Sequence, residues 1–215
     1  MSFNTVTLIL LIGFGNTCLI FLLTLLLALP LGLLISLGCM SKNKTIKHIT
    51  NSFVWIIRGT PLMLQLFVVF YLPGIVLGIP FKSRITAALI AFVINYACYF
   101  GEIYRGGILS VETGQTEAGR VLGLNKRCIF WYIVLPQVIK RIMSPMANEI
   151  ITLVKDTALV RVIAVEEIIM AAGNILSQHA LLWPFFYTGA FYLIFVGALT
   201  LCFNALEKKL NYYWV

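Results

Sequence analysis

The sequence predicts an all-α membrane protein, and its composition and long apolar runs are the observations that predict it. Hydrophobic residues make up 60% of the chain and charged residues only 11%, with a mean hydropathy of +0.96. Soluble domains average about 25% charged residues. A bilayer core of about 30 Å needs roughly 20 mostly apolar residues per helix, so 215 residues allow about five spans. We therefore expect one transmembrane domain, residues 1–215, with five helices joined by short loops.

The expected spans lie near residues 14–37, 53–77, 85–104, 137–156 and 181–203. The second span is interrupted by Arg58 and by the run Gly59-Thr60-Pro61, and the third contains Asn95. Polar groups such as Asn95 hydrogen-bond between helices inside a membrane. Neighbouring helices are expected to cover the backbone wherever proline or glycine breaks the regular pattern.

Charged residues bear on two questions: whether residues 137–156 cross the membrane, and on which side of it the chain begins. Lys140, Arg141, Asn148 and Glu149 break the apolar runs of residues 137–156, so hydropathy alone leaves this span open. Lys and Arg divide 12 to 4 between the two sides for either five or four spans, and the positive-inside rule therefore does not choose between them. The run Glu207-Lys208-Lys209 after the last span favours a cytoplasmic C-terminus, which with five spans places the N-terminus outside.

Several other classes of protein are disfavoured. The net charge of +8 is explained by basic cytoplasmic loops, and no basic run with interleaved aromatics indicates a nucleic-acid partner. The five cysteines form no CxxC pattern and do not cluster with His48 or His179, so neither a metal site nor a disulfide framework is expected. His179 lies near the expected outer surface without a ligand partner, and we assign it no role.

The polar segment between the third and fourth spans predicts a short cytoplasmic helix. Thr116 suits its N-cap, Glu117 the positive end of its dipole, and Gly123 a left-handed stop. Small residues, Ala118 and Gly119, would allow close approach by another protein. Ala118 also shares an apolar face with Val121 and Leu122 that is too small to anchor the helix in lipid. The alternative is an ordinary amphipathic helix without a partner.

The spacing around this helix resembles that of a known family. Glu117-Ala118-Gly119, three residues, Gly123, nine residues and then Ile133-Val134-Leu135-Pro136 is similar to the EAA loop of binding-protein-dependent ABC importer permeases, which usually have alanine at the position of Gly119. Four further runs resemble the polar amino-acid branch of that family: Arg58 to Leu62, Glu102 to Ile108, Gly114-Gln115, and Leu153 to Leu159.

This resemblance implies a type I, MetI-like importer permease of the inner or plasma membrane with a coupling loop at residues 110–136. Its implied partners are a dimer of ATPase subunits, an extracellular or periplasmic amino-acid-binding protein, a second permease copy or paralogue, and membrane lipid. The chain has no GxxxxGK[ST] loop, so it is not expected to be an enzyme or to hold a cofactor; ATP and Mg would be bound by the partner ATPase. The implied ATPase-coupling residues are Glu117, Ala118, Gly119, Gly123, Leu135 and Pro136.

Glu149 is the main candidate for substrate binding. An ionisable side chain within a span costs about 2.5–3.5 kcal/mol on insertion scales and usually faces a cavity or a partner. Helical spacing places Pro145, Glu149, Thr152 and Asp156 on one stripe, with Asn148 on the adjacent face. We therefore expect Glu149, Asn148 and Thr152 to contact substrate, together with Gln65 beyond the break at Pro61.

A carboxylate at this position favours a basic amino acid such as arginine, lysine or histidine, and relatives that handle cationic amino acids often carry an acid in this region. The alternatives are an internal salt bridge from Glu149 to Arg58 or Lys155, and a permease for glutamine or cystine. Arg58 and Lys155 are expected to pair structurally or to lie at interfaces. An ATP-independent secondary transporter is a further alternative, because an intramembrane acid also suits a proton-coupled carrier.

Overall fold

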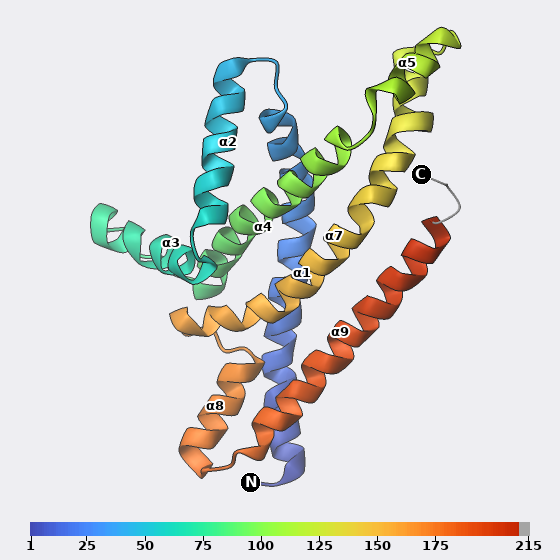
Figure 1. The fold of residues 1–215 in the computed structure, drawn as a ribbon. Helices are drawn as coiled ribbons and strands as arrows, with labels where there is room; N and C mark the ends of the chain where they lie inside the picture. The colour runs from blue at the N-terminus through green and yellow to red at the C-terminus, as the bar shows by residue number, and fades with distance from the viewer. Residues whose placement is uncertain (211–215) are drawn as a thin grey trace.

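The computed structural model describes residues 1–210, which form helices joined by short loops and contain no β-strand. Figure 1 shows a long central helix with the other helices arranged around it, the N-terminus at one end and α5 at the opposite end. The elements in chain order are α1 (Phe3–Cys39), α2 (Lys44–Gly59), α3 (Leu62–Leu77), α4 (Arg84–Leu109), α5 (Thr113–Val121), α6 (Lys126–Cys128), η1 (Ile129–Val134), α7 (Leu135–Asp156), η2 (Thr157–Ile163), α8 (Ile168–His179) and α9 (Trp183–Leu210).

The core forms where α1 crosses α4. Glycines permit this crossing: a Cβ on Gly32 would lie 2.9 Å from the Phe100 Cβ, and one on Gly101 would lie 3.0 Å from the Gly32 carbonyl oxygen. Large side chains of α4, including Phe92, Tyr96 and Phe100, are almost fully buried around this contact. Because interiors are close-packed, larger residues at the two glycines would separate the helices.

The predicted second span is two helices rather than one. α2 and α3 meet at an angle of 105° across Thr60 and Pro61. Proline lacks a backbone N–H and disfavours helical geometry in the residue before it, and Thr60 is accordingly extended, with φ −115° and ψ 144°. The Thr60 hydroxyl donates to the Ile56 carbonyl at 3.0 Å and so satisfies part of the free end of α2.

Three helices of the described chain are long and apolar enough to cross a membrane: α1, α4 and α9. The bent α2–α3 pair makes four if it counts as one broken span. α1 begins at Phe3, before the predicted start at residue 14. The predicted fourth span, 137–156, is a continuous helix within α7, but its polar residues keep it below the hydropathy of a clear span. The five-span count and the outside N-terminus therefore stay predictions.

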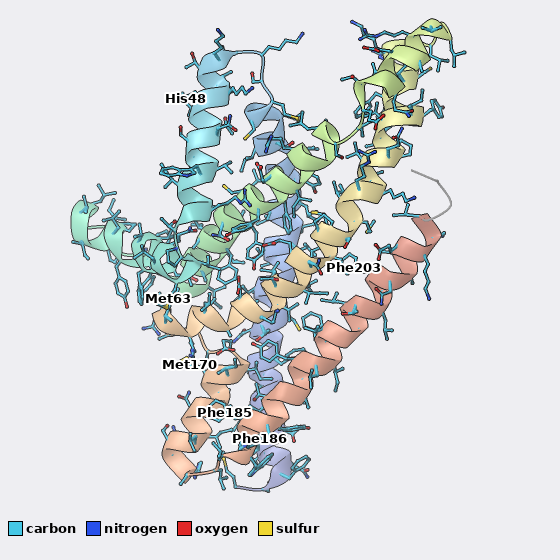
Figure 2. All side chains as sticks on the ribbon, viewed as in Figure 1. His48, Met63, Met170, Phe185, Phe186 and Phe203 are labelled. Atoms are coloured by element: carbon cyan, nitrogen blue, oxygen red, sulfur yellow. The ribbon has the colours of Figure 1, made fainter. Side chains whose placement is uncertain are left out.

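The chain after α7 turns back toward the N-terminal part of α1. η2 ends at Ile163 and is capped by Ala164, whose φ of 56° is left-handed, and α8 follows. Its N-cap is Glu167, a fully buried residue whose carboxylate accepts from the Ile169 N–H at 2.8 Å and the Met170 N–H at 2.7 Å. Burial raises the pKa of Glu167, although both amide donors oppose that rise. Figure 2 shows Phe185 and Phe186 at this end of the molecule and His48 at the opposite end.

Candidate functional site

A polar cavity of about 540 Å³ opens at the bend between α2 and α3. α4, the C-terminal half of α7 and Leu159 of η2 form its other walls, so three distant parts of the sequence contribute to it. The predicted stripe of α7 faces this cavity through three of its four members, Glu149, Thr152 and Asp156. The lining residues used below are Arg58, Asn95, Tyr96, Tyr99, Glu149, Thr152 and Asp156.

Some polar side chains of this cavity are already bonded within the chain, and others are not. The Tyr96 hydroxyl donates to Asp156 Oδ2 at 2.7 Å, which fixes that carboxylate. The Arg58 guanidinium lies over the Tyr99 ring, 5.0 Å from its centroid. Within residues 1–210, Glu149 has no hydrogen bond and no ion pair, so neither Arg58 nor Lys155 forms the alternative salt bridge with it. Glu149 is therefore the acid of this cavity whose carboxylate has no partner within the described residues.

Two of the four predicted substrate residues lie elsewhere. Gln65 does not line the cavity; its Nε2 donates to the Ile57 carbonyl at 2.7 Å and to Thr60 Oγ1 at 2.9 Å. Its Oε1 accepts from Asn95 Nδ2 at 3.0 Å, and this bond between α3 and α4 confirms the interhelical hydrogen bond predicted for Asn95. Gln65 thus fastens the bend between α2 and α3 to α4.

Asn148 faces α9 instead of the cavity. It lines a gap of about 100 Å³ together with Asn204 and Glu207 of α9. Figure 2 shows Phe203, another residue of this gap, between α9 and α7. Asn148 and Glu149 are consecutive, so their side chains point about 100° apart around the helix, and only one of them reaches the cavity.

A second polar cavity, of about 620 Å³, lies beside the start of α4 and the turn before α8. Its two best-placed polar side chains are already used within the chain. Asn16 Nδ2 donates to the Glu166 carbonyl at 2.7 Å, and Arg84 donates to the Ala164 carbonyl at 3.2 Å. These bonds hold the turn in place. Glu166, the acid of this second cavity, is exposed, whereas Glu149 is half-buried without a partner within residues 1–210. The cavity at Glu149 is the better candidate for a substrate site.

The coupling helix predicted from the EAA-like spacing is α5, at the end of the molecule opposite the N-terminus (Figure 1). It begins after Glu112, so the predicted N-cap at Thr116 is wrong, and Thr116 lies inside the helix. Its predicted end is confirmed, because Gly123 has a left-handed φ of +74°. The Gly123 N–H donates to the Arg120 carbonyl and the Leu124 N–H to the Gly119 carbonyl, the two bonds of a Schellman motif.

Gly119 serves a different purpose from the one expected. It is buried by its own chain: a Cβ there would lie 2.9 Å from Ile129 Cγ1 and 3.2 Å from Ile133 Cδ1. The expectation that Gly119 admits another protein is therefore wrong; its small size lets α5 pack against η1. The opposite face of α5 carries Glu117 and Ala118, both exposed, and the apolar Val121 and Leu122, exposed by 88% and 75%.

η1 is a π-helix that sequence reasoning did not predict. It occupies Ile129–Val134, directly before α7, and its last bond runs from the Leu135 N–H to the Phe130 carbonyl. Pro136 follows as the second residue of α7. It has no N–H, so it cannot donate a hydrogen bond to the carbonyl of the residue four positions earlier. The wider π turn accommodates this missing bond. Pro136 was the available signal, and π segments occur often at functional sites.

Direct contacts join α7 to the connection between α4 and α5. Arg141 donates to the Ser110 carbonyl, and a Cβ on Gly107 of α4 would clash with Ile142 of α7. Gln137 Nε2 of α7 donates to the Ile133 carbonyl at 2.9 Å, which joins α7 to η1. These contacts connect the region of α5 to α7, the helix that carries Glu149 and Asp156.

Comparison with known proteins identifies the class. The family model described as the binding-protein-dependent transport system inner membrane component matches residues 28–212. The chain belongs to this family. It is a multi-pass membrane protein and the permease subunit of an amino-acid ABC importer, in which the ATPase is a separate subunit.

Individual relatives differ in their named substrates. GlnP of Rickettsia felis, whose name describes a glutamine transport system permease, is 30% identical over 85% of this chain and 84% of its own length. The L-cystine permease TcyB of Bacillus subtilis is 35% identical over 85% and 78%. The nopaline permease NocM of Agrobacterium fabrum is 33% identical over 74% and 70%.

Solved structures support the fold. An amino acid ABC transporter crystallised with histidines matches with a TM-score of 0.87 and 30% identity, covering 97% of this chain and 99% of that one. The inward-facing MetNI methionine transporter matches with a TM-score of 0.75 at 17% identity, over 98% of this chain and 99% of that one. The second likeness shows the fold alone, which is the MetI-like permease fold predicted from the sequence.

Proposed function

We propose that this permease imports a basic amino acid, arginine, lysine or histidine, and that Glu149 binds the cationic side chain. The observation that carries the proposal is the unpartnered Glu149 carboxylate in a cavity of about 540 Å³. A buried or half-buried charge is costly unless it is paired. A cationic substrate supplies the missing partner during transport.

The other charges of the cavity suit the remaining parts of an amino acid. Arg58, a cation with five N–H donors, can take the substrate carboxylate in a bidentate arrangement. Tyr99 beneath the guanidinium keeps Arg58 oriented. Asp156, fixed by Tyr96, is available to the α-ammonium group. With two acids and one cation, the lining favours a ligand with one net positive charge.

We further propose that two such permease subunits assemble with an ATPase dimer and receive the amino acid from an external binding protein. Closure of the ATPase dimer would act on α5 through Glu117, Ala118 and the exposed Val121 and Leu122. The contacts of Gly119 with Ile129 and of Arg141 with Ser110 would carry this movement to α7 and produce alternating access. Exposed apolar residues on a short cytoplasmic helix favour a covering partner.

Import of glutamine or cystine is the second candidate, favoured by the names of two relatives. A neutral side chain would leave Glu149 without an opposite charge, and the carboxylate would then act only as a hydrogen-bond acceptor. A transporter of the same fold was crystallised with histidines, which supports the basic candidate. A histidine imidazole can carry a positive charge, and Glu149 has no cation paired with it in the part of the chain that the structure describes.

The test is substrate-stimulated ATP hydrolysis by the reconstituted complex with Glu149→Gln. The substitution keeps the shape and removes the charge, so arginine or lysine should stimulate hydrolysis at least about tenfold less than in the wild type. Asn148→Ala is the matched control, because Asn148 is the preceding residue of α7 and faces α9. Equal stimulation of wild type and Glu149→Gln would contradict the proposed role.

A further inference from the structure

A third cavity lies in the seam between α5 and η1, apart from the substrate cavity. It has a volume of about 250 Å³ and is lined by Thr116, Arg120, Lys126, Ile129, Phe130 and Val134. One wall therefore offers a hydroxyl and two cations, and the other is apolar. Within residues 1–210, neither Arg120 nor Lys126 forms an ion pair with an acid. This combination suits a ligand with an anionic head beside an apolar body.

The cavity is on the face of α5 that turns away from the proposed ATPase contact. Thr116 and Arg120 are one helical turn apart and flank Gly119, which packs on Ile129. Glu117 and Val121 lie about 100° further around the helix and are exposed. A protein covering that exposed side would leave the seam free.

The neighbouring residues are of the kinds that gather at a membrane surface. Phe130, Trp131 and Tyr132 are exposed by 45%, 62% and 78%, and they precede α7, which contains the predicted 137–156 span. Tryptophan and tyrosine concentrate at the level of the lipid headgroups. Lys126 and Arg127 precede the aromatic residues, and basic residues beside a span attract anionic lipids of the cytoplasmic leaflet.

We infer that the seam between α5 and η1 binds an anionic phospholipid of the cytoplasmic leaflet. Arg120, Lys126 and the Thr116 hydroxyl hold its phosphate, while Ile129, Phe130 and Val134 contact its glycerol and upper acyl chains. Since Ile129 also packs on Gly119, the bound lipid braces the coupling helix against α7. The lipid composition of the membrane then influences how firmly ATPase closure is transmitted.

The inference is tested by quenching Trp131 with brominated lipids. Trp55, Trp183 and Trp214 are replaced by phenylalanine, and the full-length permease is reconstituted in phosphatidylcholine vesicles containing brominated phosphatidylglycerol or brominated phosphatidylcholine. Because two cations line the cavity, brominated phosphatidylglycerol should quench Trp131 at about tenfold lower mole fraction than brominated phosphatidylcholine. The double variant Arg120→Gln with Lys126→Gln should remove this preference. Each single substitution should reduce it, and the single variants provide the test if the double variant fails to fold.

The matched control is Lys44→Gln with Lys47→Gln, which removes two basic residues from α2 and should keep the preference. Equal quenching by the two lipids, or equal loss in the control, would overturn the inference. If added inorganic phosphate abolishes the preference, the cavity binds free anions, and the inference is overturned. Loss of the preference when the ATPase subunit is added would assign the cavity to that protein interface and likewise overturn it.

Discussion

The coupling segment and the substrate cavity lie toward opposite ends of α7 and are held together by different forces. At the coupling end, α5 is held by apolar contacts of Gly119 with Ile129 and Ile133, and its outer face is exposed. At the cavity, polar contacts also join the helices, as in the hydrogen bond between Tyr96 and Asp156. The 22 residues of α7 extend about 33 Å and join the two regions. Changes at one end should therefore alter coupling, and changes at the other should alter substrate preference.

The largest expected effect comes from reversing the charge of Glu117. Glu117→Lys changes the exposed face of α5 without disturbing the packing of Gly119, so insertion should be normal. Truncating or reversing a charge that is buried in a protein interface costs about 2–5 kcal/mol, enough to abolish stable pulldown of the ATPase. Glu112→Lys is the control, since Glu112 is also exposed but precedes the helix. Undiminished pulldown with Glu117→Lys would remove this face from the docking role.

The next effect concerns the packing between α5 and η1. Gly119→Leu inserts a side chain where a Cβ alone would lie 2.9 Å from Ile129 Cγ1. Overpacking costs about 1–3 kcal/mol and should shift α5, reducing ATP-driven uptake at least about tenfold. Gly114→Leu on the same helix is the control, because a Cβ there meets no atom within 4 Å. Equal uptake by the two variants would mean that the seam does not fix the position of α5.

The smallest expected effect is at the cavity. Tyr96→Phe removes the hydroxyl that donates to Asp156, and an interhelical hydrogen bond of this kind is worth about 0.6–2 kcal/mol. A modestly lower Tm and weaker substrate binding should follow, with ATPase pulldown unchanged. Tyr99→Phe keeps the ring under Arg58 and should have little effect. A loss of ATPase binding in Tyr96→Phe would show that the two ends of α7 are not separable.

The two regions also differ in how far the sequence predicts them. The coupling segment is contiguous, so the spacing from Glu117 to Pro136 and the stop at Gly123 predict its place and its end. The role of Gly119 was missed, because a small residue in a sequence does not reveal whether the chain itself or a partner covers it. Pro136 gave the only hint of the π-helix.

The cavity is assembled from distant segments, and only its part on α7 follows from helical spacing. Glu149, Thr152 and Asp156 share it as predicted. Gln65 lies outside the cavity lining because the 105° bend turns its amide back onto Ile57 and Thr60. Asn148 faces α9, which begins 35 residues later, and packing against so distant a helix is not readable from local periodicity. Arg58 reaches the cavity through the same bend, which no single-helix pattern contains.

The most direct test of the account is ATP hydrolysis by the wild-type permease, reconstituted with its ATPase and binding protein and screened across the amino acids. The unpartnered Glu149 predicts stimulation by arginine, lysine or histidine and little by glutamine or cystine. Stimulation by glutamine or cystine alone would contradict the basic substrate. Ion-gradient-driven uptake by the permease without any ATPase would contradict ATP-driven transport through α5.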